Sequence, residues 1–495
     1  MLIFHISIKE TKRRQTEKTY MLFTSLEFLL FFFPVALGVY LFLPHRARNY
    51  WLFFVSLVFY AWGEPIFVLV MLFSIICNYF AALHIEELEI GSLLKKSFLA
   101  LVICINLGIL FVFKYMNFLT ENLRAWFPTL QNNIQQTNIV LPIGISFFTF
   151  QAISYVIDVY RGTPAQKNIC YLGLYIAFFP QLIAGPIVRY TTIMDQMEQR
   201  KITRTSFTEG MSRFLYGFNK KILLANLLAL IADEAFGLKN LSVGMAWLGA
   251  ICYSLQIYFD FSGYSEMAIG LGKMFGFDFL ENFNYPYISK TITEFWRRWH
   301  ISLGSWFRDY VYFPLGGSRV KSKARLIFNL AVVWLATGAW HGANWSFIAW
   351  GLLHGLMVIL EKLFFIPQKL SQRRGLSIIY QIFVLQLVIF GWILFRAEGF
   401  GDGFVYIKSM FGLNGNTLAD DTFRFNVQEY GVILLAGIIC ATPVFRLAEN
   451  KLRFVSGKME ALCNNSASVI QFILFLISIS FLVMNTHNPF IYFNF

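Results

Sequence analysis

Long apolar runs separated by short polar connections divide most of the chain. An α-helix needs about 20 apolar residues to cross a bilayer, and most of the runs approach or exceed that length. None has the alternating pattern of a β-strand. The pattern predicts an all-α polytopic membrane protein with about eleven transmembrane helices. The runs are Leu22–Leu43, Trp51–Leu83, Ser97–Phe118, Ile139–Val159, Tyr171–Val188, Phe214–Ala235, Met245–Phe277, Leu326–Trp340, Trp345–Phe365, Leu376–Phe395, Tyr430–Val444 and Ser468–Met484.

Proline and glycine interrupt several runs. Trp51–Leu83 is either two spans or one span broken at Glu64 and Pro65. Backbone groups freed by a break at membrane depth need partners from protein or from a water-filled cavity. The interruptions therefore predict broken or re-entrant helices around an interior cavity. The residues that mark them are Pro142, Gly144, Pro180, Gly185 and Pro186.

Composition supports the same class. Hydrophobic residues make up 57% of the chain and charged residues 14%, whereas soluble domains have roughly 45–50% and about 25%. These values exclude a water-soluble globule and a disordered chain. The 56 Phe, 23 Tyr and 12 Trp residues suit helices that face acyl chains and end among headgroups, so the lipid bilayer is an expected partner.

The net charge of +13 arises mostly in short connections between the runs. This is the bias of cytoplasmic loops rather than of a nucleic-acid-binding surface, so we expect no nucleic-acid partner. Lys290–Arg325 is strongly basic and is predicted to face the cytoplasm. Counting spans from it puts Ala339–Asn344 near the outer side and the C-terminus outside.

The chain divides into three predicted parts. Residues 1–20 are a basic N-terminal extension, after which Met21 is an alternative natural start. Residues 21–487 form the transmembrane domain, and residues 488–495 form an aromatic extracytoplasmic tail. The run from Leu22 is too long for the apolar core of a cleavable signal peptide, so we expect it to remain as the first span.

One histidine lies between two apolar spans. His341 belongs to the segment Ala336–Trp345, near the predicted outer side. An ionisable group at membrane depth is costly and is by default a candidate functional residue. Neutral imidazole can take a proton from a hydroxyl, which would make His341 a general base. The alternative is that His341 only donates a hydrogen bond to a neighbouring helix.

A second candidate site combines cations with aromatic rings near the cytoplasmic side, and it includes His300. These residues could form an ordinary interfacial belt. They could equally bind an anionic donor, with guanidinium groups on phosphates and rings on a base. The residues alone leave both interpretations open. Besides His300, they are Trp296, Arg297, Arg298, Trp299 and Arg308.

Two carboxylates, Asp260 and Glu266, lie in an otherwise apolar run. We expect them to face the interior and to pair with Arg or Lys. No close His or Cys spacing accompanies them, so we expect no metal site. The chain has no phosphate-binding glycine loop, no serine-nucleophile elbow and no zinc-protease motif.

Five strings resemble the membrane-bound O-acyltransferase family, and best its bacterial branch of alginate O-acetylases and teichoic-acid D-alanyl transfer proteins. The resemblance extends from Met21 to Phe495 and implies a helix bundle around a central tunnel. It also implies that His341 is essential and that His300 is its partner. The strings are LPIGISFFTFQAISYVIDVYRG from Leu141, FFPQLIAGPIVRY from Phe178, YFDFSGYSEMAIGLGKMFGF from Tyr258, FWRRWHISLGSWFRDYVYFPLGG from Phe295 and GAWHG from Gly338.

The resemblance implies an O-acetyltransferase of a bacterial cytoplasmic (inner) membrane, with an alginate-acetylase type of substrate. Acetyl-CoA or another acyl thioester would be the cytoplasmic donor, with no bound cofactor, and an extracytoplasmic polysaccharide hydroxyl would be the acceptor. An SGNH-type acetyltransferase partner is expected to finish the transfer. His300 would position the thioester, while Asp260, Glu266 and Asn344 would be polar groups of the tunnel. The alternatives are D-alanyl transfer to teichoic acid and a non-enzymatic transporter.

The tail carries one side-chain hydroxyl, that of Tyr492. Exposed aromatic rings are unfavourable in water, so we expect the tail to fold back into the protein or to dock into a partner. If Tyr492 lies beside His341, its phenol could accept the acyl group and relay it. The alternative is that the tail is only a hydrophobic anchor.

Overall fold

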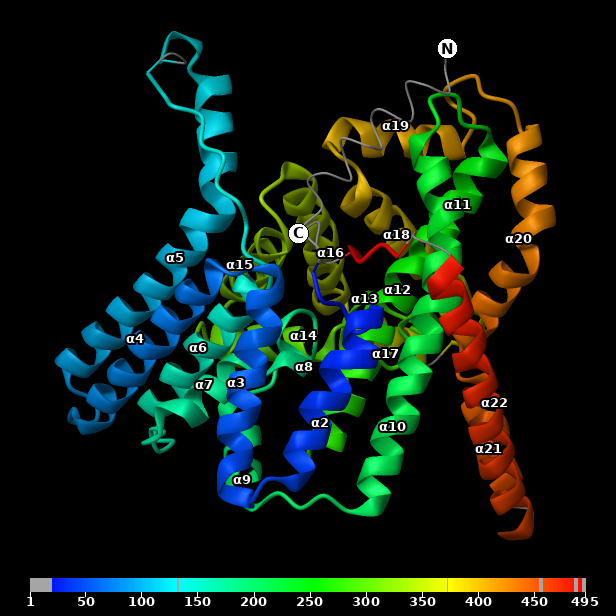
Figure 1. Ribbon diagram of the computed structural model, residues 1–495. Helices are drawn as coiled ribbons and strands as arrows, with labels where there is room; N and C mark the ends of the chain where they lie inside the picture. The colour runs from blue at the N-terminus through cyan, green and yellow to red at the C-terminus, as the bar shows by residue number, and fades with distance from the viewer. Residues whose placement is uncertain (1–19, 131–132, 372, 454–456, 485–487, 492–495) are drawn as a thin grey trace.

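The computed structural model describes residues 20–130, 133–371, 373–453, 457–484 and 488–491. In these ranges the chain forms helices and loops without a strand (Figure 1). Seven of the described helices are long and apolar enough to cross a membrane, which confirms the all-α polytopic class. They are α4 (Phe67–Glu87), α5 (Leu93–Trp126), the continuous helix Arg204–Gly237, α16 (Trp345–Leu363), α18 (Arg374–Arg396), α20 (Asp421–Cys440) and α22 (Gly457–Met484).

Several predicted spans are shorter or interrupted helices. The run at Trp51–Leu83 is two helices, because α3 (His45–Gly63) ends immediately before Glu64 and Pro65. The run at Tyr171–Val188 is split into α7 (Ile169–Ala177) and α8 (Phe179–Leu182). Pro180 stands in the first turn of α8, where its missing N–H leaves no hydrogen bond unmade. The other helices of this half are η1 (Phe28–Phe32), α2 (Phe33–Phe42), η2 (Pro128–Leu130), α6 (Ile145–Tyr160) and α9 (Tyr190–Gln199).

The helix α12 (Val243–Met274) is buried along most of its length and forms the centre of the bundle. It packs against α10 (Arg204–Asn219), which continues through the π-helix η3 (Lys220–Ala225) into α11 (Asn226–Gly237). Glycines allow this approach, because a Cβ on Gly263 would lie 2.8 Å from the Gly217 carbonyl oxygen. One on Gly270 would lie 2.5 Å from that of Gly210. Facing small residues are the usual device for close helix packing in membranes.

Short helices connect the centre to the C-terminal half. The segment after α12 contains η4 (Pro286–Ile288), α13 (Ile292–Arg298), α14 (Ile301–Phe307) and η5 (Arg308–Tyr312). It leads into the helical hairpin of α15 (Lys323–His341) and α16. In Figure 1, α13 and α14 lie in the interior, while α5 and α22 lie on opposite sides of the molecule. The remaining helices are α17 (Ile366–Ser371), α19 (Phe400–Met410) and α21 (Val444–Arg453).

Candidate active site

His341 is the last residue of α15, and its side chain is buried. Its ring lies edge-on to Trp350 and Phe395, with centroid distances of 4.9 and 5.2 Å. The two helices of this hairpin approach closely, because a Cβ on Gly351 would lie 3.0 Å from the Cα of Gly338. The Nδ1 atom of His341 is buried without a hydrogen-bond partner among the described residues. An imidazole held in this way is oriented by ring packing and keeps a nitrogen for proton transfer.

His300 connects α13 to α14 and has a left-handed backbone, with φ of 45°. Few residues with a branched or bulky side chain adopt this conformation, so the surrounding contacts must hold it. The backbone N–H of Ser302 donates to Oδ1 of Asn282 at 3.2 Å, which identifies that atom as the amide oxygen. His300 Nδ1 lies 3.1 Å from the same oxygen and therefore donates to it. Nε2 remains as the acceptor of a neutral ring, and it is buried without a described partner.

Trp340 connects the two histidines. Its ring centroid lies 6.0 Å from that of His300 and 5.0 Å from that of His341. Phe150 packs against the same indole ring, at 5.7 Å. The fold thus brings together the two histidines that the sequence identifies, one on each of two distant segments.

A small pocket of about 30 Å³ lies beside His341. Its lining includes Lys114 from α5, residues 141–147 and Ile183. The predicted break before α6 is present here, because Gly144 has φ of 73° and starts that helix. A cavity at an interrupted span is what the sequence predicts. His341 is among the described residues that line this pocket, and His300 is not.

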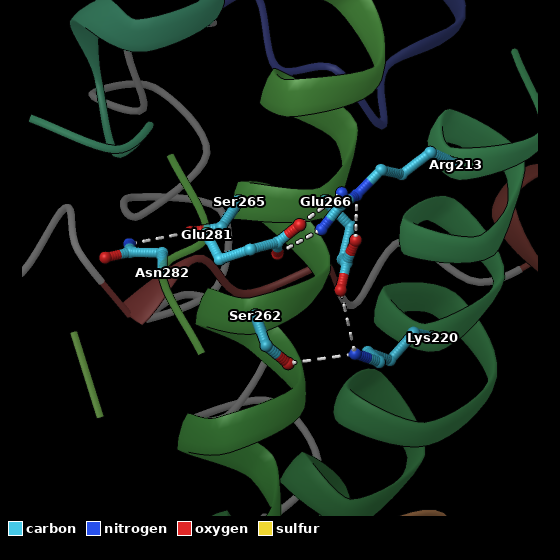
Figure 2. A network of polar contacts seen from close by, with 7 residues as sticks. All are labelled: Arg213, Lys220, Ser262, Ser265, Glu266, Glu281 and Asn282. Carbon is cyan, nitrogen blue, oxygen red and sulfur yellow. Dashed lines mark hydrogen bonds and ion pairs between the residues drawn. The ribbon is translucent and has the colours of Figure 1, made fainter. Parts of the chain in front are cut away.

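A polar network on α12 leads to Asn282 (Figure 2). Glu266 pairs with Arg213 at 2.5 Å and lies 3.9 Å from Lys220, so the expected pairing of this carboxylate is present. Its neighbour Ser265 accepts a hydrogen bond of 3.0 Å from the Asn282 amide, the group that also holds His300. Charged partners therefore fix α12, and α12 in turn fixes Asn282.

Asp260 is also paired, as the sequence predicts. Its carboxylate lies 2.7 Å from the Lys221 ammonium group, and the two side chains are 2% and 3% exposed. Lys221 and Lys220 both belong to η3, so this wider helical segment directs two consecutive lysines to α12. Both charges of the pair are therefore buried inside the bundle.

The described part of the tail, residues 488–491, is folded against this pair. Lys221 donates to the Pro489 carbonyl, and the Ile491 N–H donates to Asp260 Oδ2 at 2.8 Å. The Phe490 ring packs against Tyr264, with centroids 4.8 Å apart. These residues fold back into the protein, as expected. Tyr492 lies outside the described residues.

The residues of the second candidate site do not share one surface. Trp299 is buried against Trp392, and Trp296 packs against His354. The Arg298 guanidinium group pairs with Glu294 at 2.9 Å, and that of Arg308 lies 3.1 Å from Asp309. Arg297 is exposed. The two tryptophans therefore shape the aromatic interior, while the arginines lie at its edge.

Asn344 caps a helix. Its side-chain oxygen accepts the Ser346 N–H at 3.0 Å, and its amide donates to the Glu398 carbonyl at 2.9 Å. These contacts start α16 and join it to the segment before α19, which fixes the loop after His341. Asn344 therefore contacts both the first turn of α16 and the segment before α19.

Sequence reasoning missed three residues around the site. Lys114 is an ionisable group in an apolar run, so the argument that identified His341 could have found it. Glu361 lies in the apolar run Trp345–Phe365 and could have been found in the same way. Asn282 gave no signal, because its role depends on distant partners. Glu361 is fully buried and accepts the N–H groups of Ile292 and Thr293, which caps α13.

Comparison with known proteins gives consistent matches. Residues 168–399 match the model of the membrane-bound O-acyltransferase family. The chain is 42% identical to a probable alginate O-acetylase AlgI of Azotobacter vinelandii, over 91% of this chain and 90% of that protein. It is 31% identical to a peptidoglycan O-acetyltransferase of Helicobacter pylori, over 96% and 98%. It is 30% identical to a teichoic acid D-alanyltransferase of Bacillus subtilis, over 53% and 70%.

Proposed function

Because the chain belongs to the membrane-bound O-acyltransferase family, we propose that it acetylates an extracytoplasmic polysaccharide, as an alginate O-acetylase does. Acetyl-CoA or another cytoplasmic acyl thioester is the donor, and the membrane is the bacterial inner membrane. The similarity to probable alginate O-acetylases over 91% of the chain carries this proposal. The match to the D-alanyltransferase covers 53%, which favours acetyl over D-alanyl as the cargo.

In the proposed reaction His341 is the general base. Its buried ring lines the pocket, where an acceptor hydroxyl can reach it. The hydroxyl oxygen attacks the thioester carbonyl carbon, and His341 takes the hydroxyl proton. His300 positions the donor through Nε2, which its bond to Asn282 leaves as an acceptor. When the carbon–sulfur bond breaks, the proton passes from His341 to the thiolate, which gives an ester and a free thiol.

An SGNH-type acetyltransferase outside the membrane completes the proposed route by passing the acetyl group to the polymer. Mass spectrometry of the envelope polysaccharide, with and without the gene, tests the acceptor. We expect acetyl esters on alginate to disappear in the deletion strain. If acetyl is lost from peptidoglycan alone, peptidoglycan rather than alginate is the acceptor. If D-alanine is lost from teichoic acid, the protein transfers D-alanine to that polymer. Unchanged esters on all these polymers, with no thioester use by the purified protein, would leave the transporter alternative.

The arginines at the edge of the aromatic interior give one prediction. Arg297→Ala and Arg298→Ala are expected to raise the KM for acetyl-CoA more than they change the use of acceptor. Loss of one charge-assisted hydrogen bond costs about 1.5–3 kcal/mol, so KM should rise roughly tenfold or more. The difference from wild type should shrink at high salt. Steady-state kinetics at two ionic strengths measure both effects.

Arg424→Ala is the control for these variants. Arg424 is largely exposed and lies 3.6 Å from Asp421, in the first turn of α20. Its loss should leave the KM for acetyl-CoA unchanged. If Arg297→Ala and Arg298→Ala behave like this control, the arginines belong to an interfacial belt and do not bind the donor.

The tail gives a second prediction, on the proposed relay through Tyr492. Tyr492→Phe keeps the ring and removes the only side-chain hydroxyl of the tail. In a relay, polymer acetylation and the thiol release coupled to it should therefore both be lost. The reason is that a phenol oxygen is the group that would carry the acetyl ester. Acetyl content of the polymer in complemented deletion cells measures the effect. Normal acetylation by Tyr492→Phe would show that the tail is an anchor.

A further inference from the structure

Lys114 is a buried cation in the middle of α5. It is 8% exposed, and its ammonium group donates to Ser146 Oγ at 3.2 Å and to the Trp340 carbonyl. Both partners are neutral, and Lys114 forms no ion pair with a described carboxylate. Two other buried lysines, Lys220 and Lys221, have Glu266 and Asp260 as counterions. A membrane-depth charge without an opposite charge is costly and is retained where it serves a function.

The position of Lys114 relates it to His341. Both side chains line the same pocket, and the carbonyl that Lys114 binds belongs to the residue before His341. An ammonium group has three N–H donors, and the described hydrogen bonds use two of them. The Trp340 ring centroid lies 5.7 Å from the same nitrogen. The third is available to a molecule in the pocket, beside the proposed base.

We infer that Lys114 is a further catalytic residue, which stabilises the negative charge that develops on the acyl carbonyl oxygen. The inference rests on the proposed function and assigns a role that the two histidines leave unfilled. When the acceptor oxygen bonds to the carbonyl carbon, the carbonyl π electrons move to its oxygen. Lys114 donates its free N–H to that oxygen without losing its proton. The charge returns to the carbonyl when the carbon–sulfur bond breaks, and His341 protonates the departing thiolate.

The same contacts could serve only to cap the end of α15. Tyr115, the next residue on α5, provides the control for that role. Its hydroxyl donates to the Ala339 carbonyl at 2.7 Å, one residue before the carbonyl that Lys114 holds. Tyr115 thus caps the same helix turn without a charge. A capping role predicts similar losses from both side chains, whereas charge stabilisation predicts a loss from Lys114 alone.

The experiment compares Lys114→Met, Lys114→Arg and Tyr115→Phe in the full-length protein in detergent. Thiol release from acetyl-CoA is followed with and without alginate oligosaccharides. Loss of one oxyanion donor lowers kcat by roughly 10²–10³-fold, and we expect this for Lys114→Met with little change in either KM. Lys114→Arg should recover part of kcat, and Tyr115→Phe should stay close to wild type. Elution volume and melting temperature report whether each variant is folded.

Other results overturn the inference in distinguishable ways. If wild type releases no thiol, the proposed function fails, and the role of Lys114 fails with it. If wild type is active but Lys114→Met is equally active, only the inference fails. Equal losses in Lys114→Met and Tyr115→Phe would make Lys114 a helix cap. A raised KM for the oligosaccharide with unchanged kcat would make it a binding group for an acceptor carboxylate. If Lys114→Met does not fold, the kcat of Lys114→Arg tests the inference instead. A Lys114→Arg variant that is less stable than wild type but has the same kcat would overturn it.

Discussion

His341→Ala is expected to lower acetyl transfer by roughly 10²–10⁴-fold, the usual cost of losing a general base. The ring lines the pocket beside the break before α6, and its Nδ1 has no described partner that would engage it elsewhere. Removal of the ring should therefore remove the proton acceptor and leave the helices in place. Thiol release and acetyl transfer by the purified variant measure the effect, with size-exclusion elution as the folding check.

His354→Gln is the matched control. His354 is also buried, also has an Nδ1 without a described partner and packs against Trp350, but it is not among the described residues of the pocket. Packing changes alone should affect the two sites similarly, so His354→Gln should keep most of the activity. His341→Gln, which preserves size better than alanine, should be as inactive as His341→Ala. Retention of half the wild-type rate by either His341 variant would exclude it as the base.

The sequence predicts the fold class because hydrophobic length is a strong and local signal. The breaks at Pro65 and Pro180 are equally local, since a proline limits the helix around it. The packing of α12 on α10 was not predictable in this way. It depends on the close contact of Gly263 with Gly217. The sequence of either helix alone does not indicate which helix it will pack against.

In the candidate site, too, single residues were predictable from the sequence and their contacts were not. His341 and Asp260 are visible because an ionisable residue in an apolar run stands out. Their partners are set by tertiary contacts, such as Asp260 with Lys221 and with the Ile491 backbone. For Trp299 the sequence suggests the wrong environment. Its position in a basic and aromatic string suggests a ligand-binding surface, but the fold buries its side chain. Composition alone does not distinguish a ring that binds a ligand from one that fills the core.

The pair of Lys221 and Asp260 gives the prediction with the largest effect on stability. Lys221→Met leaves a buried carboxylate without its cation, and Asp260→Asn leaves a buried ammonium group without its anion. Breaking a buried pair on one side typically costs about 3–5 kcal/mol, so each single variant should melt well below wild type in detergent. Lys221→Met should also loosen the tail, because it removes the hydrogen bond to the Pro489 carbonyl.

The double variant Lys221→Met, Asp260→Asn separates the charge from the packing. It removes both charges, keeps an amide oxygen that can accept the Ile491 N–H and loses only the bond to Pro489. Because an uncompensated charge is the main cost in each single variant, the double variant should recover most of the lost stability. Thermal melting of all four proteins in one detergent provides the double-mutant cycle. If the two losses simply add, the residues act independently, and the ion pair does not hold the tail against α12.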